Sequence, residues 1–442
     1  MIAASQTDRQ NKELAQALRA GQDSTHDINL LCEAITYESV TGNEANFVRF
    51  LHTQMTARQL SPTQADFLPN RPNIWGQRQG TRGEKQCAPR LLFIGHSDTV
   101  HARDWGEEWR GTAQENPFAG TLTEDEIWGR GSVDLKGGIC ASLAALDLLD
   151  QIGITLRGDV AFAFVGDEES GEPGSGISAG IKDYVARVQK SEIEKADFAI
   201  YLEPTKLAIY PSQIGFFITD VAITGKSAYF GTPEHGIDAL KAAHQLQAAL
   251  FVYAQELTDT GSHPLVGPAH LLITQQQAGG LIAVPGHCHM SLIRKLRPGE
   301  DMDHAVAEFE ARVHQVPFED GITVAMTYPA GRNHRAGGTP TEVPADLPAI
   351  RQLTNALRAS TSPDEMPHAG AIEGAPYWSE MPFLADQLGC PTVYCAPGDI
   401  SLAHTSYERL KVDEYLASIR AFALFIADFC GTHPPSQEGD IS

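Results

Sequence analysis

The sequence lacks the features that mark a membrane protein or a secreted protein. No apolar run in its 442 residues approaches the length of a membrane span. The first 22 residues are polar and contain no apolar signal core. The cysteines have no paired spacing, which favours reduced thiols over a disulfide framework. These absences predict a cytoplasmic protein that has no membrane partner.

Positive charge is also scarce. The chain carries 33 Lys and Arg against 56 Asp and Glu, a formal net charge of −23. A chain this acidic repels nucleic acid and anionic membranes, so we expect neither as a partner. The length exceeds what one hydrophobic core usually organises, and two domains are therefore expected.

Strands and helices alternate over the first half of the chain. Buried strands are predicted in "RLLFIGHSDTV", "GDVAFAFVG" and "ADFAIYLEP", and a helix in "GGICASLAALDLLDQIG". This βαβ rhythm predicts an α/β fold with a mainly parallel sheet and helices on both faces, as in phosphorylase/hydrolase-like catalytic domains.

A second pattern begins near residue 214. Strands and helices then follow in the order β-α-β-β-α-β, which fits a small ferredoxin-like α+β domain. The strand "PTVYCAP" and the last helix belong again to the larger sheet. We therefore predict a catalytic domain formed by 1–213 and 331–442, with an inserted domain at 214–330.

Acids and a histidine stand where three predicted strands end. His96 and Asp98 follow the first strand, Glu168 and Glu169 the second, and Glu203 the third. Ligands of such sheets gather at the carboxyl ends of the strands, so these side chains are expected to converge.

Asp134, in the glycine-rich loop "GRGSVDLKGG", and His404, after the last strand, complete the set. Carboxylates crowded together repel one another, and a cation removes that conflict. Two histidines with several carboxylates are ordinary ligands for Zn²⁺, Mn²⁺ or Co²⁺. One or two such ions are therefore the predicted cofactors.

These motifs resemble a known family, the dinuclear metallopeptidases and deacylases that include acetylornithine deacetylase, succinyl-diaminopimelate desuccinylase, aminoacylase and glutamate-releasing carboxypeptidases. The resemblance rests on "SVTGNE", "RPNIWG", "GHSDTV", "WGRGSVDLKGG", "DEESG", "LEPT" and "CPTVYCAPGDISLAH". The C-terminal stretch looks most like acetylornithine deacetylase.

The resemblance implies a role for each ligand. His96 and Glu203 hold one metal, Glu169 and His404 hold the other, and Asp134 bridges the two. The inserted domain dimerises in this family, which implies a homodimer.

Two acids complete the implied catalytic machinery. Asp98 accepts the second ring N–H of His96 and fixes its tautomer. Glu168 is the general base, which takes a proton from the metal-activated water and passes it to the leaving nitrogen.

The inserted domain departs from the family pattern. Tyr229 stands where the family's helper histidine is expected, and Lys295 stands near the position of an arginine. His235 is one candidate to compensate for the missing histidine, and Trp378 is a candidate for lining an aromatic pocket. These four residues are the predicted substrate-binding positions.

Three functions fit the sequence. The first is a metallohydrolase that cleaves an amide, N-acyl or N-carbamoyl C–N bond of a small carboxylated substrate. The second is a hydrolytic deaminase of an electron-poor aromatic amine, which the missing histidine would suit. The third is a non-catalytic metal-binding scaffold.

Overall fold

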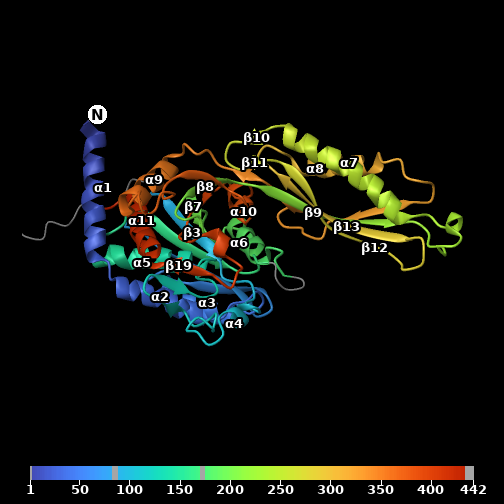
Figure 1. Ribbon diagram of the computed structural model, residues 1–442. Coiled ribbons are helices and arrows are strands. Elements are labelled where there is room, and N and C mark those ends of the chain that lie inside the picture. The colour runs from blue at the N-terminus through green and yellow to red at the C-terminus, as the bar shows by residue number, and fades with distance from the viewer. Residues whose placement is uncertain (1, 82–87, 170–174, 434–442) are drawn as a thin grey trace, which may run out of the picture. The chain divides into compact units, whose positions relative to one another are not determined.

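The computed structural model describes residues 2–81, 88–169 and 175–433, with the side chains of residues 12 onward. The chain divides into two units (Figure 1). The larger unit runs to Pro211 and also contains Val343–Glu373 and the chain from Phe383 onward; the smaller unit contains Ser212–Glu342 and Gly374–Pro382.

A central sheet organises the larger unit. Its strands within that unit are β1 Thr63–Leu68, β2 Arg71–Arg78, β3 Arg90–His96, β6 Asp159–Val165, β7 Phe198–Tyr201 and β18 Thr392–Tyr394. Two further strands, β8 Ile209–Gln213 and β17 Ile372–Ala375, span the boundaries between the units in the chain, and β16 Thr341–Glu342 consists of residues of the smaller unit. A separate three-stranded sheet contains β4 Thr121–Leu122, β5 Glu126–Trp128 and β19 Arg409–Lys411.

Four parallel strands form the middle of the central sheet. Its order is β1-β2-β6-β3-β7-β18-β8-β16, and β17 also pairs with β8. The strands β6, β3, β7 and β18 run parallel to one another, whereas the outer pairs are antiparallel. Every residue of β3 is buried, as expected of a parallel strand covered on both faces.

The helices of the larger unit are α1 Ile2–Gly21, α2 Ser24–Thr36, α3 Ala45–Ala57, α4 Trp105–Glu108, α5 Lys136–Gln151, α6 Ala179–Gln189, α9 Pro348–Ser360 and α11 Val412–Cys430, together with α10 Met381–Ala385, which begins in the smaller unit. Of these, α3, α5, α6 and α11 contact strands of the sheet, whereas α1 and α9 pack on α11. The apolar α11 contacts β3 and β6, and its Phe422 ring lies 5.3 Å from that of Phe93. Within the described residues, no helix is both long and apolar enough to cross a membrane.

The smaller unit is built around a second sheet. Its elements are β9 Gly215–Thr224, the 3₁₀ turn η1 Pro233–His235, α7 Ala239–Asp259, β10 Ser262–His263, β11 Gly267–Pro268, β12 His270–Ala278, β13 His287–Leu296, α8 Met302–His314, β14 Thr323–Thr327 and β15 Gly337–Gly338.

Antiparallel strands in the order β12-β13-β9-β14 form this second sheet. Burial alternates along β9, so one of its faces packs with α7 and α8 (Figure 1). This is the predicted ferredoxin-like arrangement. Together with the parallel core of the larger unit, it confirms the predicted fold class.

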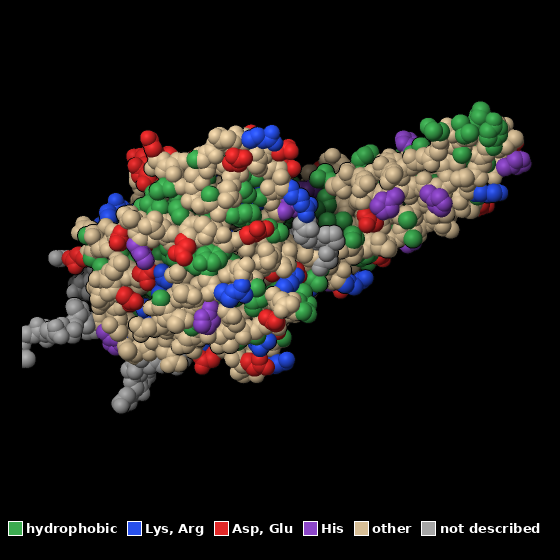
Figure 2. Space-filling model, turned by 90° about the horizontal axis from the view of Figure 1, so that it is seen from below, with side chains coloured by type: hydrophobic (Ala, Val, Ile, Leu, Met, Phe, Trp, Pro, Cys, Tyr) green, Lys and Arg blue, Asp and Glu red, His purple; other side chains and the backbone are tan. Residues whose placement is uncertain are grey.

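Exposed apolar side chains gather at one end of the smaller unit (Figure 2). Tyr229, Phe230 and Ile282 are 58%, 61% and 65% exposed. A backbone hydrogen bond from Phe230 to Ile282 and a bridge between Tyr229 and Ala283 join the two loops that carry them. These loops therefore present a surface rather than a core.

Candidate metal centre

Three neighbouring parallel strands bring the predicted ligands to one edge of the central sheet. His96 is the last residue of β3, Glu169 follows β6, and Glu203 lies two residues beyond β7. The strands are buried and apolar up to these points, so the polar side chains begin where the backbone leaves the sheet.

Asp134 and His404 join the strand-end residues to form two groups. His96 Nε2 lies 3.0 Å from Asp134 Oδ1 and 3.7 Å from Glu203 Oε1. His404 Nε2 lies 3.0 Å from Glu169 Oε1 and 3.2 Å from Asp134 Oδ2. In each group the donor atoms lie within 4.8 Å of one another. Asp134 gives one oxygen to each group.

Burial and the close spacing of the charged groups shift the pKa values of this cluster. Burial, followed by repulsion from Asp134, raises the pKa of Glu169 to about 7. Hydrogen bonds to Asp134 and Glu169 raise the pKa of His404 to about 11. Burial opposes ionisation of Asp134, but hydrogen bonds from His404 and His96 outweigh it and lower its pKa. The carboxylates thus stay ionised only where positive charge lies beside them.

The donor set fits two divalent cations. Imidazole nitrogen and carboxylate oxygen are the ligands that Zn²⁺, Mn²⁺ and Co²⁺ share. Five residues supply two groups of three through the shared Asp134. A cation in each group would supply the positive charge that these pKa shifts demand.

Asp98 contacts other groups than the one predicted. The acceptor 2.8 Å from His96 Nδ1 is the backbone carbonyl of Asp98, whereas the nearer carboxylate oxygen is 3.9 Å away. The expectation that the Asp98 carboxylate holds this ring nitrogen is therefore wrong. The chain turns after β3 so that the carbonyl reaches the ring first. It still fixes the ring, as a carboxylate would.

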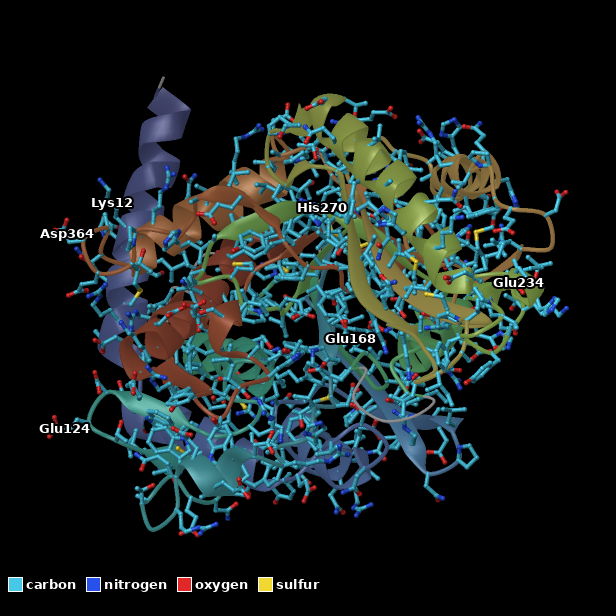
Figure 3. All side chains as sticks on the ribbon, turned by 45° about the vertical axis from the view of Figure 1, so that its right-hand side comes forward. Lys12, Glu124, Glu168, Glu234, His270 and Asp364 are labelled. Atoms are coloured by element: carbon cyan, nitrogen blue, oxygen red, sulfur yellow. The ribbon has the colours of Figure 1, made fainter. Side chains whose placement is uncertain are left out.

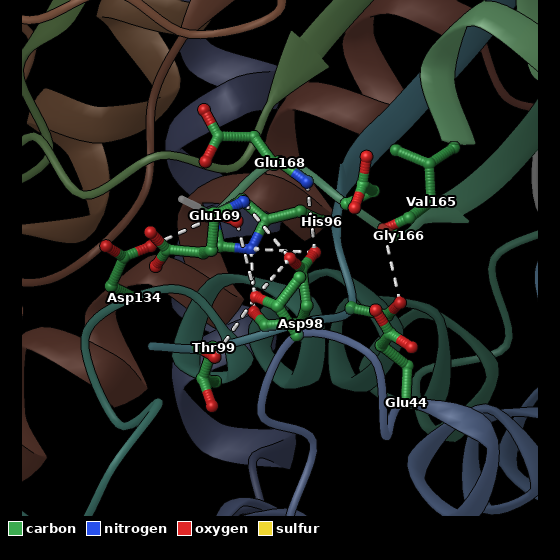
Figure 4. Close-up of polar contacts among 12 residues, drawn as sticks. Glu44, His96, Asp98, Thr99, Asp134, Val165, Gly166, Glu168 and Glu169 are labelled. Atoms are coloured by element: carbon green, nitrogen blue, oxygen red, sulfur yellow. Dashed lines mark hydrogen bonds and ion pairs between the residues drawn. The ribbon is translucent and has the colours of Figure 1, made fainter. Parts of the chain in front are cut away.

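The Asp98 carboxylate instead binds the loop that carries the two glutamates (Figure 4). Its Oδ2 accepts the backbone N–H of Glu169 at 3.0 Å, and its Oδ1 that of Glu168 at 3.3 Å. The hydroxyl of Thr41 donates to Oδ2 at 2.9 Å. Asp98 thereby fixes the backbone of the predicted base and of one predicted ligand.

Glu168 itself is half-buried. Its side chain extends away from Asp98, whose carboxylate accepts the backbone N–H of Glu168 (Figure 4). Figure 3 shows Glu168 within the body of the larger unit, whereas Glu124 projects from its edge. This placement suits a carboxylate that exchanges a proton with a bound molecule.

A second buried network supports the same loop. Arg71 ion-pairs with Glu44 and, at 2.8 Å, with Asp167. Asp167 also accepts backbone N–H groups from the turn that leads into α6. Sequence reasoning assigned these residues no role, although Glu44 and Arg71 lie in the motifs "SVTGNE" and "RPNIWG".

Two predicted substrate-binding residues are exposed in the smaller unit. Tyr229 is 58% exposed, and its ring lies 4.7 Å from that of Phe230. His235 is the last residue of the turn η1 and is also exposed.

The other two predicted positions are engaged within the smaller unit. Lys295 Nζ donates to the carbonyl of Val266 at 2.6 Å, and burial lowers its pKa. Trp378 Nε1 donates to the carbonyl of Thr339 at 3.1 Å. Both side chains therefore already have structural partners.

Comparison with known proteins agrees with this geometry. Residues 92–428 match the model of peptidase family M20/M25/M40. The chain belongs to this family. Members of this M20 family are metallohydrolases that act on amide and peptide bonds, and the chain is accordingly a metallohydrolase of C–N bonds.

Two M20 relatives and one solved structure illustrate the match. The chain is 26% identical to acetylornithine deacetylase of Pectobacterium atrosepticum over 332 residues, which cover 74% of this chain and 75% of that one. It is 32% identical to succinyl-diaminopimelate desuccinylase of Methylorubrum populi over 208 residues, 45% and 48% of the two chains. An M20 metallo-carboxypeptidase from Sulfolobus solfataricus has the same fold, with a TM-score of 0.69, 16% identity, and coverage of 91% and 99%.

Proposed function

We propose that this M20 protein hydrolyses an N-acyl or N-carbamoyl bond, or releases a C-terminal residue, of a small carboxylated molecule. The two groups that share Asp134 would hold two cations, Zn²⁺, Mn²⁺ or Co²⁺. That sharing carries the proposal, because a carboxylate between two triads of donors is the arrangement of a two-metal hydrolytic site. Relatives named deacetylase and desuccinylase support the choice of an N-acyl bond.

Each residue has a separate task in this mechanism. His96, Asp134, Glu169, Glu203 and His404 hold the cations, which when bound lower the pKa of a water molecule and polarise the substrate carbonyl. Glu168 takes the proton from the attacking water and returns it to the leaving nitrogen. The Asp98 carboxylate keeps Glu168 in place by accepting the backbone N–H of Glu168.

The first test is a substrate and metal screen on the purified protein. After treatment with a chelator, activity on N-acetyl, N-succinyl and N-carbamoyl amino acids and on dipeptides should vanish, and Mn²⁺, Co²⁺ or Zn²⁺ should restore it. Electron-poor anilines serve as the competing substrate class. Equal activity of stripped and reconstituted protein would reject the proposal.

The second test isolates the base. The variant Glu168→Gln should lose about 10²–10⁴-fold in kcat while binding the same amount of metal, because the amide cannot accept the proton. Glu124→Gln is the matched control, since Glu124 is an exposed glutamate of the same unit. Normal turnover by Glu168→Gln would show that another group accepts the proton of the attacking water.

We also propose that the smaller unit forms a homodimer. In the part of the chain that the structure describes, β12 pairs with β13 alone, so its outer edge is open to a second copy. Leu272 on β12 and Phe251 on α7 are 52% and 62% exposed. Sedimentation should show a dimer that Leu272→Lys weakens, and a monomeric wild type would contradict this.

A further inference from the structure

Two segments that carry predicted ligands are joined along their length. The strand β19 pairs antiparallel with β5, Arg409 opposite Trp128. The contact continues past these strands, because the Gly129 N–H donates to the Glu408 carbonyl at 3.2 Å. His404 lies just before β19 in the chain, and Asp134 lies just after β5. The pairing therefore fixes one ligand loop against the other.

The side chain of Glu408 occupies the end of this junction. It is fully buried, and its Oε1 accepts the backbone N–H groups of Gly131, Val133 and Asp134, each at 3.0 Å. Three converging N–H groups form a cradle for one carboxylate oxygen. One of them belongs to Asp134, the residue shared by both metal groups.

Arg130 connects the other carboxylate oxygen to the segment after His404. Its guanidinium ion-pairs with Oε2 of Glu408, and its Nη2 donates to the carbonyl of Thr405 at 3.3 Å. His404 has a φ of +62°, a left-handed backbone that persists only where surrounding contacts fix it. The Arg130–Glu408 pair supplies such contacts next to both Asp134 and His404.

We propose that Glu408 is a positioning residue of the metal centre, which sets the distance between Asp134 and His404 so that both bind the same cation. This inference rests on the proposed metal-dependent function. Glu408 accepts backbone N–H groups of the 130–134 loop, and it therefore acts through the backbone of that loop. Arg130 holds the carboxylate and carries the constraint to the other loop.

The variant Glu408→Gln tests this with almost no change in volume. The amide oxygen can still accept from the loop, but the NH₂ group then faces the Arg130 guanidinium, donor against donor. The loop therefore loses its fixed position. We expect one of the two cations to bind about 10–100-fold more weakly, measured by Zn²⁺ or Co²⁺ competition with a chelator. At saturating metal, kcat should fall while KM changes little.

A matched control separates positioning from general stability. Asp159 is another fully buried carboxylate, paired with Arg90 at 2.9 Å and with the Gly80 N–H at 3.0 Å, at the start of β6 rather than at the site. Asp159→Asn should lower the unfolding temperature but leave metal affinity and KM unchanged. A loss of affinity in both variants would mean that Glu408 has only a structural role.

A milder variant keeps the proposal testable if Glu408→Gln does not fold. Arg130→Lys keeps a positive charge beside Glu408 but loses the fork that reaches Thr405, so metal affinity should fall about three- to tenfold. Wild-type affinity in every Glu408 and Arg130 variant that folds would overturn the inference. Absence of metal binding by the wild type would instead overturn the proposed function.

Discussion

Among the described residues, the larger unit buries more charged side chains than the smaller unit, in which Arg294 and Glu380 are buried. In the larger unit, five carboxylates near the metal centre are 5% exposed or less: Asp98, Asp134, Glu169, Glu203 and Glu408. In the smaller unit, the core between the sheet and its two helices consists of hydrophobic side chains. Most of its histidines and several of its aromatic residues are exposed.

This difference indicates which unit contains the candidate functional site. Burying several carboxylates together lowers stability unless cations or donors compensate, so such a cluster indicates a functional site. The smaller unit has a conventional core and an exposed rim of Tyr229, Phe230 and Ile282. Its departure from the family pattern at Tyr229 lies on that surface, whereas both candidate metal groups lie within the larger unit.

The largest expected effect follows from removing the shared ligand. Asp134→Asn removes the negative charge that both groups share, and it replaces one of the two oxygens, which face His96 and His404 separately, by an NH₂ group that cannot bind a cation. We expect activity to fall by at least about 10³-fold, beyond the 10–100-fold typical of outer-shell changes. Metal analysis should give fewer than two ions per chain. Two ions bound to this variant would show that the groups do not share Asp134.

The buried charge of the larger unit should also appear as a pH effect on stability. Burial raises the pKa of Asp27 from 3.8 to about 6, although a hydrogen bond from Gln22 opposes the shift. The folded state therefore holds a proton between these pH values that the unfolded state has lost. Stability falls as pH rises through this window, by at most about 3 kcal/mol.

Replacing Asp27 by Asn removes this titration. The free energy of unfolding of Asp27→Asn should match that of the wild type near pH 4 and exceed it near pH 6.5, as measured by denaturant unfolding at both pH values. A constant difference between the two proteins across this range would show that Asp27 does not titrate as described. Asp27 lies in α2, outside the metal groups, so activity is not needed as a readout.

A smaller effect is expected from the hydroxyl that supports Asp98. Thr41→Val keeps the shape of the side chain but removes the donor to the Asp98 carboxylate. We expect kcat to fall about tenfold because Asp98 then holds the 168–169 backbone less firmly. Thr41→Ser, which keeps the hydroxyl, should retain most of the activity. Equal activity of the Val and Ser variants would show that the Thr41 hydroxyl does not support the site.

Much of the fold was accessible from the sequence. Apolar runs that end in acids predicted β3, β6 and β7, and adjacent parallel strands must end at one edge of a sheet. The same reasoning predicted that His96, Glu169 and Glu203 converge, as the structure places them. The order of elements in the inserted unit also followed from their periodicity.

The supporting contacts were not accessible in the same way. A spacing of two residues cannot tell whether the carbonyl or the carboxylate of Asp98 reaches His96. Arg71 meets Glu44 and Asp167 only because distant segments fold together. The cradle around Glu408 depends on Gly131 at a φ of +88°, which no local pattern reveals. Such contacts depend on tertiary structure rather than on sequence motifs.

The smallest expected effect tests the surface character of the smaller unit. Tyr229→Phe removes only a hydroxyl from a side chain that is 58% exposed. The free energy of unfolding should change by less than about 0.5 kcal/mol. Tyr328→Phe is the matched change in the same unit, because that hydroxyl donates to Glu310 at 2.8 Å, and it should cost about 1–2 kcal/mol. A cost at Tyr229 as large as at Tyr328 would mean that its hydroxyl has a structural partner.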